Sequence, residues 1–218
     1  KKDSAIGTVI LFHGHMGTKG SLLVAGEEFY NRGYNVMPVD FRAPGNTEGK
    51  ACRIGKEEGE EIKLAYDYVK SLGEENIILW GTSMGAAAIT SSFNTYDDLK
   101  PSKIILEMPF GRLRDAVRGR VKQMGIPQEP VASLFTFWGS VEQGYWAFSY
   151  APEEYVKKIT CPVLLQWGAK DLRVSKNETD AVYKNIAAAN KKLVVYENAG
   201  HESLIKNDSV LWRNEVGR

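Results

Sequence analysis

The sequence contains little cysteine, little histidine and almost no net charge. Cys52 and Cys161 are the 2 cysteines among 218 residues; they lie far apart and lack metal-site spacing. A chain of this length does not need a disulfide to fold, so both are expected to be ordinary thiols. The formal net charge of +1 creates no field that would draw nucleic acid or anionic lipid to the chain. With 3 histidines, no P-loop and no dinucleotide fingerprint, the sequence predicts no metal, no cofactor and no nucleic-acid partner.

Long apolar runs are also missing, since none approaches the roughly 20 residues that a membrane-spanning helix needs. Hydrophobic residues at 43% and charged residues at 25% are typical of a soluble globular protein. The length suits a single domain over residues 1–218. The chain begins with Lys1-Lys2-Asp3 and not with Met, so an upstream targeting segment is not excluded. Cellular localisation and oligomeric state therefore stay open.

Short β-rich apolar runs alternate with longer helical stretches. The candidate strands are Thr8–His13, Asn35–Asp40, Asn76–Trp80, Lys103–Glu107, Pro162–Trp167 and Lys192–Glu197. The candidate helices cover about Ser21–Arg32, Gly55–Leu72, Met84–Phe93, Ser175–Ala189 and His201–Val216. Several strands are continuous apolar runs, which is typical of strands buried on both faces. The alternation predicts an α/β fold: a mostly parallel sheet of about six strands with helices on both faces.

The segment between the fourth and fifth strands is too long for a simple crossover. Residues 109–160 begin with a basic, helical piece, Gly111–Met124, and continue into an aromatic stretch, Ser133–Pro152. We expect a cap or lid inserted over one end of the sheet. The basic residues indicate either a solvated helix face or an anion-binding cap. Some aromatic rings must pack the insertion onto the body and others can line an acyl pocket; Trp138 and Trp146 are expected to influence chain-length preference.

Chemistry-bearing residues follow the strands at their carboxyl ends, where parallel sheets bind ligands. Ser83 follows the third strand between Gly81 and Gly85, Asp171 follows the fifth strand, and His201 follows the sixth. A histidine can take the proton of a serine hydroxyl near neutral pH, and a carboxylate on the other ring nitrogen fixes the tautomer. The pattern predicts Ser83 as nucleophile, His201 as base and Asp171 as acid. Glu107, at the neighbouring strand end, is the rival acid.

An acyl-transfer reaction also needs donors for the oxyanion of its tetrahedral intermediate. The backbone N–H of Met84, at the start of a helix, is one candidate. The loop His13-Gly14-His15 offers the second, and we expect it to be the N–H of His15. His13 itself is expected to be structural or to face substrate.

Five motifs together resemble the α/β-hydrolase superfamily. They are GTSMG around Ser83, HGHMG from His13, DFRAPG from Asp40, GAKD ending at Asp171 and NAGH ending at His201. The chain is most similar to the compact branch of dienelactone-hydrolase-like, serine-aminopeptidase-like and monoglyceride-lipase-like esterases. The resemblance implies the same roles for Ser83, Asp171, His201, Met84 and His15. That family's sheet usually begins with an antiparallel pair before the HG loop, and the sequence starts too late to hold both strands. Either a six-stranded core suffices here or a piece is absent.

The sequence therefore predicts a serine hydrolase acting through an acyl-enzyme on a small-molecule acyl substrate, and a carboxylic ester is favoured. Thioesterase, peptidase and acyltransferase activities remain open on the same residues, because a fold does not fix its substrate. A non-catalytic binding protein with the same cleft is the alternative from another class. Asp40 and Arg42 are expected to form a structural loop pair.

Overall fold

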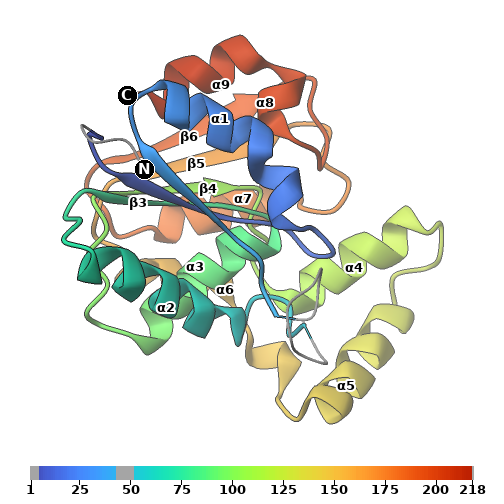
Figure 1. Ribbon diagram of the computed structural model, residues 1–218. Helices are drawn as coiled ribbons and strands as arrows, with labels where there is room; N and C mark the ends of the chain where they lie inside the picture. Colours follow the sequence, from blue (N-terminus) through green and yellow to red (C-terminus); the bar gives the residue numbers. More distant parts are fainter. Residues whose placement is uncertain (1–4, 43–51, 218) are drawn as a thin grey trace.

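A computed structural model describes residues 5–42 and 52–217 of the chain. Its centre is a sheet of six strands, all parallel, in the order β2-β1-β3-β4-β5-β6 (Figure 1). The strands are β1 Thr8–Phe12, β2 Asn35–Val39, β3 Ile77–Thr82, β4 Lys103–Glu107, β5 Val163–Gly168 and β6 Lys191–Tyr196. The predicted fold class is thus confirmed. Pro38 lies in β2, an edge strand, where a missing backbone N–H is tolerated.

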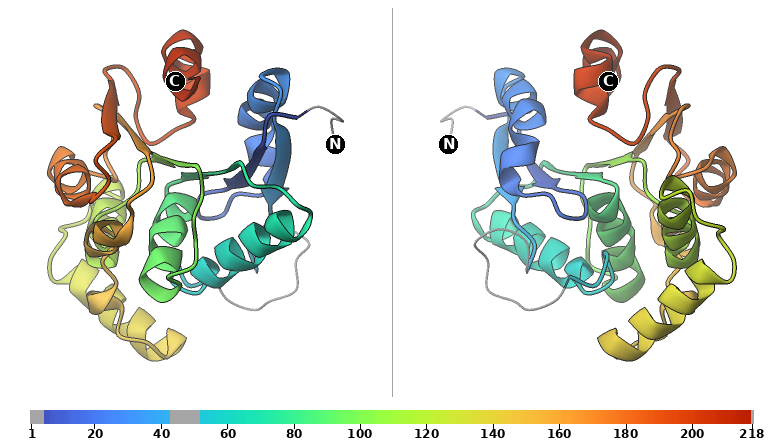
Figure 2. Two further views of the ribbon diagram at one scale, coloured as in Figure 1. Left: turned by 90° about the vertical axis from the view of Figure 1, so that its left-hand side faces the viewer. Right: turned by 90° about the vertical axis from the view of Figure 1, so that its right-hand side faces the viewer.

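Helices cover both faces of the sheet (Figure 2). The helices of the body are α1 Leu23–Asn31, α2 Glu58–Ser71, α3 Met84–Thr95, α7 Lys176–Asn185, α8 Leu204–Asn207 and α9 Ser209–Val216, with a 3₁₀ turn η1 at Lys19–Leu22. Phe29 of α1 and Trp212 of α9 pack in one apolar cluster. Ile62 of α2, Ile89 of α3 and Val182 of α7 pack in the other. The apolar runs of the central strands supply both clusters, as expected for strands buried on two faces.

Successive strands are added first on one side of β1 and then on the other, and this change of side determines where the site lies. The connection from β1 leads to β2 at one edge, and the chain then returns to β3 on the other side of β1. The carboxyl ends of β1 and β3 therefore flank the switch point, where open parallel sheets bind ligands. Register aligns these ends, since Phe12 pairs with Gly81 and Thr82 pairs with Glu107.

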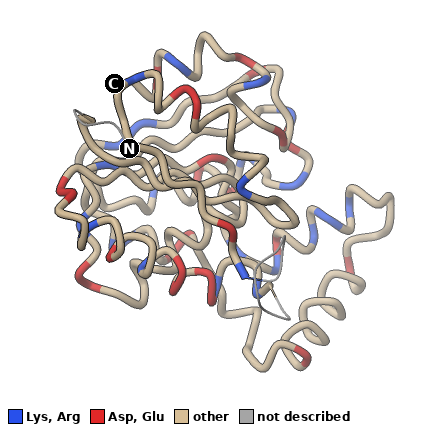
Figure 3. The backbone as a smooth tube through the Cα atoms, in the orientation of Figure 1, with Lys and Arg blue, Asp and Glu red and all other residues tan. Residues whose placement is uncertain are grey.

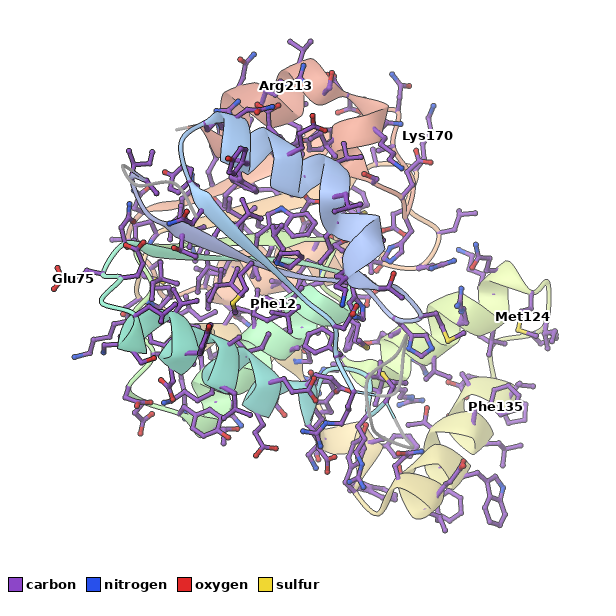
Figure 4. The ribbon with its side chains drawn as sticks, viewed as in Figure 1. Phe12, Glu75, Met124, Phe135, Lys170 and Arg213 are labelled. Carbon is purple, nitrogen blue, oxygen red and sulfur yellow. The ribbon has the colours of Figure 1, made fainter. Side chains whose placement is uncertain are left out.

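The insertion between β4 and β5, residues 109–160, is called the cap segment below. It contains α4 Leu113–Gln123, α5 Val131–Gln143, η2 Ala147–Ser149, α6 Pro152–Tyr155 and η3 Val156–Lys158. Figure 1 shows α4 and α5 as an arm that projects from the body near the carboxyl ends of the strands. Figure 4 shows Met124 and Phe135 on this arm, whereas Glu75, before β3, lies on the opposite side of the molecule.

One predicted helix is wrong in its extent. The stretch His201–Val216 forms two helices, because Asp208 interrupts it and its side chain accepts a hydrogen bond from Leu211 N–H at 2.9 Å as the cap of α9. The first of the two helices begins at Leu204. His201 consequently lies in a loop.

Candidate active site

Ser83 stands at a strained turn between β3 and α3. Its backbone adopts φ 51° and ψ −114°, an unusual conformation for a residue with a side chain. Gly81 and Gly85, two residues before and two residues after Ser83, leave the space that this turn requires. A β-carbon at Gly81 would lie 2.7 Å from the Ala86 nitrogen, and one at Gly85 would lie 2.4 Å from the Phe12 carbonyl oxygen. The turn therefore needs both glycines.

His201 and Asp171 continue from Ser83 as a chain of hydrogen bonds. His201 Nε2 lies 2.9 Å from Ser83 Oγ, and His201 Nδ1 lies 2.7 Å from Asp171 Oδ2. Because an ionised carboxylate only accepts, Nδ1 carries the proton and Nε2 accepts from the serine hydroxyl. The Asp171 side chain is fully buried, and its Oδ1 accepts from the backbone N–H groups of Arg173 at 2.7 Å and Val174 at 3.0 Å. The structure thus brings together the three side chains predicted from sequence.

The loops that carry the acid and the imidazole are packed directly on each other. A β-carbon at Gly168, the last residue of β5, would lie 2.5 Å from the Ala199 carbonyl oxygen. Lys170 N–H donates to that same oxygen at 2.8 Å. This contact between the loops after β5 and β6 sets the spacing between Asp171 and His201.

Glu107, the rival acid, lies elsewhere. Its carboxylate oxygen Oε1 accepts hydrogen bonds from Trp80 Nε1 at 3.1 Å, Gln166 Nε2 at 3.2 Å and Trp212 Nε1 at 2.6 Å. Burial raises the pKa of Glu107 to about 7. Its contact with Ser83 is through the backbone, where the Glu107 carbonyl accepts from Ser83 N–H at 2.7 Å.

The loop after β1 lies in contact with Ser83. A β-carbon at Gly14 would lie 3.4 Å from Ser83 Cβ, and a tight turn follows in which Gly17 N–H donates to the Gly14 carbonyl at 3.0 Å. His13 is buried: its Nδ1 donates to the Gly14 carbonyl at 2.8 Å and its Nε2 accepts from Phe41 N–H at 3.1 Å. These bonds hold the ring in place and give His13 a structural role in the loop.

Met84 and His15 both border the space in front of Ser83. Met84 is the first residue of α3, where backbone N–H groups have no partner within the helix. Burial lowers the pKa of His15, and the Arg120 guanidinium adds to this effect. Both residues thus border the same cavity as Ser83, and their role as oxyanion donors stays a prediction.

A cavity of about 220 Å³ opens at Ser83 and His201, and α4 forms most of its far wall. The wall is largely apolar; its apolar residues from the cap segment are Phe110, Leu113, Ala116, Val117, Val121, Met124 and Phe135. Two arginines, Arg120 and Arg173, also line the cavity. Nothing in the sequence separates Arg120 from the other basic residues of α4 or marks Arg173 as a residue of the cavity.

The aromatic residues of the cap segment divide into three groups. Tyr150 and Tyr145 attach the segment to the body: the Tyr150 hydroxyl lies 3.3 Å from the Ala87 carbonyl, and the Tyr145 hydroxyl lies 3.2 Å from the Arg53 carbonyl. Phe135 borders the cavity. Trp138 and Trp146 are 63% and 57% exposed and do not border it. The structure therefore favours residues of the cavity wall, and not these two tryptophans, as the ones that influence chain-length preference.

Other candidate residues have structural partners. Asp40 pairs with Lys19 at 3.0 Å, and Arg42 pairs with Glu61 and Glu60, so the predicted pairing of Asp40 with Arg42 is replaced by two separate contacts. The rest of the DFRAPG motif, residues 43–45, lies outside the described residues. Cys52 and Cys161 are free thiols, and burial raises the pKa of Cys52 to about 12, which makes it a poor nucleophile.

Two further findings concern metals and membranes. Within residues 5–42 and 52–217, no group of three or more His, Cys, Asp or Glu side chains is arranged to hold a metal ion. None of the helices in this described part of the chain combines the length and apolarity needed to span a membrane.

A parallel sheet with a strained serine after its third strand and an insertion after its fourth defines an α/β-hydrolase. More narrowly, the chain belongs to the serine aminopeptidase, S33, family, whose model matches residues 3–141.

Two solved esterases share the fold. Esterase Pf2001 of Pyrococcus furiosus is 23% identical with a TM-score of 0.82, covering 99% of this chain and 82% of the other. Esterase EaEST of Exiguobacterium antarcticum is 19% identical with a TM-score of 0.72, covering 98% of this chain and 91% of the other.

A curated relative is also similar in sequence. Lysophosphatidylserine lipase ABHD12 of Danio rerio is 26% identical over 190 residues, which cover 85% of this chain and 48% of the relative. The chain thus spans about half the length of that lipase.

Proposed function

We propose that this protein is a carboxylic-ester hydrolase that acts through an acyl-enzyme on Ser83. The observation that carries the proposal is the hydrogen-bonded chain from Ser83 Oγ through His201 to the buried Asp171 carboxylate. A serine held in this way is an activated nucleophile, and a protein that only bound a ligand would have no use for the arrangement.

The proposed reaction has two halves, acylation and deacylation of Ser83. His201 Nε2 takes the hydroxyl proton as Ser83 Oγ attacks the ester carbonyl, and the backbone N–H groups of Met84 and His15 receive the oxyanion. Collapse of the intermediate passes the proton from His201 to the leaving alcohol. His201 then takes a proton from water as the water oxygen attacks the acyl-enzyme carbonyl. When this second intermediate collapses, His201 returns the proton to Ser83 Oγ and the acid is released. Asp171 holds the tautomer of His201 and stabilises the imidazolium in both halves.

An ester is favoured over other acyl compounds by the wall of the cavity and by the relatives. Apolar side chains surround the space in front of Ser83, which suits an acyl or alkyl chain. The similar proteins include a lipase and two esterases by name. The name of the family, serine aminopeptidase, keeps an amide substrate as the second candidate.

A fluorophosphonate probe separates an enzyme from a binding protein. We expect the wild-type protein to be labelled and Ser83→Ala to remain unlabelled, with His201→Ala labelled slowly at best. A panel of ester, thioester and aminoacyl-amide substrates then ranks the leaving groups. Folded wild-type protein that neither reacts with the probe nor hydrolyses any member of the panel would leave a binding function in its place.

A second buried carboxylate, Glu107, provides a matched control for Asp171. Asp171→Asn should lower kcat by about 10³–10⁴-fold, because an amide that donates to His201 favours the wrong tautomer. Glu107→Gln alters an equally buried carboxylate that lies away from His201 and should lower kcat far less. Equal losses in the two variants, each checked for folding by circular dichroism, would refute the role of Asp171.

A further inference from the structure

Two arginines from different parts of the chain meet in the cavity that contains Ser83 and His201. Arg120 belongs to α4 of the cap segment, and Arg173 follows Asp171 in the loop after β5. Both line the cavity together with His15. Figure 3 shows basic residues along α4 and none along α5, so positive charge within the arm is concentrated on the helix that forms the cavity wall.

The structure holds these two residues close together. A β-carbon at Gly119 would lie 2.2 Å from the Arg173 carbonyl oxygen, so α4 contacts the loop through a residue without a side chain. Gln123 Oε1 accepts a hydrogen bond from Arg173 Nε at 3.0 Å and lies 3.5 Å from Arg120 Nη1. Two guanidinium groups thus share one neutral acceptor. Burial lowers the pKa of Arg173, and the charge of Arg120 lowers it further.

The neighbouring arginines of the cap segment are neutralised, and these two are not. Arg112 pairs with Glu153, and Arg114 and Arg118 pair with Glu129. Among residues 5–42 and 52–217, no carboxylate lies within ion-pair distance, 4.0 Å, of the Arg120 or Arg173 guanidinium. The nearby Asp171 carboxylate is occupied by His201 and by two backbone N–H groups.

Two like charges beside an apolar cavity repel each other, and an anion would relieve that repulsion. Guanidinium groups bind carboxylate and phosphate oxygens with paired, charge-assisted hydrogen bonds. The alternative, a pair of arginines that only contact water, would make the cavity no more favourable for an anionic than for a neutral ester.

We propose that Arg120 and Arg173 form an anion subsite, and that the preferred substrates are esters with an apolar chain and a carboxylate or phosphate group. The inference rests on the proposed hydrolysis at Ser83 and names its substrate class. The subsite belongs to the rim of the cavity, where α4 meets the loop that carries Asp171.

Matched pairs of esters test the subsite. Mono-4-nitrophenyl adipate against 4-nitrophenyl hexanoate places a carboxylate on the acyl side. A decanoylglycerol 3-phosphate against the same decanoylglycerol places a phosphate on the alcohol side. In the wild-type protein we expect kcat/KM to favour the anionic member of at least one pair by about tenfold, mainly through KM. Whichever pair shows the preference identifies the side of the ester that carries the charge.

Variants locate the source of the preference. Arg120→Gln and Arg173→Gln should each reduce the ratio of anionic to neutral kcat/KM by about tenfold, and Arg120→Lys should retain most of it. Lys122→Gln removes the same charge from an exposed position of α4 outside this cavity and should leave the ratio unchanged. Raising the salt concentration should lower kcat/KM for the anionic ester more than for the neutral one, because salt screens the attraction between exposed charges.

An unchanged ratio in both arginine variants, or a wild-type protein that prefers the neutral ester in both pairs, would overturn the subsite. Failure of the hydrolase proposal looks different, since no ester of either pair would then be turned over. Calorimetric binding of mono-4-nitrophenyl adipate to Ser83→Ala, with and without Arg120→Gln, measures the subsite without catalysis. Equal affinity of these two proteins would also refute it.

Discussion

At the scale of single residues, Glu107 is a buried carboxyl group with a strongly raised pKa. It lies at the end of β4, fully enclosed, with two indole N–H groups and one amide group donating to one of its oxygens. Burial opposes ionisation and the three donors favour it; burial prevails, and the pKa is raised to about 7. Glu107 therefore affects the stability of the fold, whereas Asp171 accepts a hydrogen bond from the imidazole of His201.

The raised pKa predicts a pH dependence of stability. Between about pH 4.5 and 7 the folded protein holds a proton on Glu107 that the unfolded chain has lost. This stabilisation is complete below about pH 4.5 and disappears as the pH rises to about 7. Because each pKa unit corresponds to about 1.4 kcal/mol, the difference in unfolding free energy between wild type and Glu107→Gln should fall by about 3 kcal/mol over this range. Urea unfolding at several pH values measures it, and parallel profiles for the two proteins would contradict it.

At the scale of elements, the two glycines of the turn and the glycine of α5 have opposite roles. Gly85 lies in the first turn of α3 with no room for a side chain, since a β-carbon there would meet the end of β1. Gly139 lies within α5, where a β-carbon would meet no atom within 4 Å. The first glycine is required by a contact between elements, and the second only weakens its helix.

Alanine at each position should therefore change stability in opposite directions. Gly85→Ala should lower the free energy of unfolding by about 2–3 kcal/mol or more, because the backbone must shift, and should slow fluorophosphonate labelling. Gly139→Ala should raise the free energy of unfolding by up to about 1 kcal/mol, since alanine favours helix. Denaturant midpoints give both values. A Gly85→Ala protein as stable and as reactive as wild type would rule out the tight contact with β1.

Helix α5 has an inverted distribution of polarity. Its buried residues are Ala132, Thr136 and Ser140, and Leu134, Phe135, Phe137, Trp138 and Val141 are exposed. Thr136 and Ser140 donate to backbone carbonyls four residues earlier, which satisfies their hydroxyls inside the arm. Periodicity alone would have assigned the opposite face of this helix to the core.

The wall of the cavity, and not the exposed tryptophans, should set acyl-chain preference. Val117→Phe adds volume at the wall and should lower kcat/KM for decanoate relative to acetate esters by about tenfold or more. Trp138→Ala removes a larger side chain outside the cavity and should leave the chain-length profile unchanged. Rates over the series from acetate to decanoate provide the comparison. A profile that responds to Trp138→Ala and not to Val117→Phe would place the acyl chain elsewhere.

At the scale of the whole molecule, the last helix closes the structure over the centre of the sheet. Trp212 of α9 is fully buried, packs against Phe29 of α1 with ring centroids 5.4 Å apart, and donates to Glu107 Oε1 at 2.6 Å. Residues separated by 105 positions thus share one buried hydrogen bond. Figure 1 shows α9 beside α1 on the same side of the sheet.

Removing the indole N–H while keeping an aromatic ring isolates this bond. At pH 8, where Glu107 is ionised, Trp212→Phe should destabilise the protein by about 2–3 kcal/mol. Val210→Ala, on the same helix at a position 67% exposed, should change the free energy of unfolding by less than about 0.5 kcal/mol. A double-mutant cycle with Glu107→Gln should show coupling. Simple additivity of the two substitutions would mean that the hydrogen bond contributes nothing.

The sequence by itself determined the parallel sheet and the edge at which the chemistry gathers. Apolar runs such as those of β3 and β5 are buried on both faces, and residues after parallel strands meet at one edge whatever the details of packing. Gly81 and Gly85 likewise marked the turn at Ser83, because a strained backbone has few residues that tolerate it. These signals come from residues that are neighbours in the sequence, so they can be recognised without knowledge of the fold.

Only the tertiary structure decided which long-range partners meet. Asp171 and Glu107 each follow or end a strand, and the packing of Gly168 on Ala199 brings the first, and not the second, to His201. In the same way the approach of Gly119 to Arg173 places Arg120 in the cavity, while α5 leaves Phe137 and Trp138 exposed and outside it. Loop paths and helix rotations depend on contacts between residues far apart in the chain, and hydrophobic periodicity reports only the burial of each local segment.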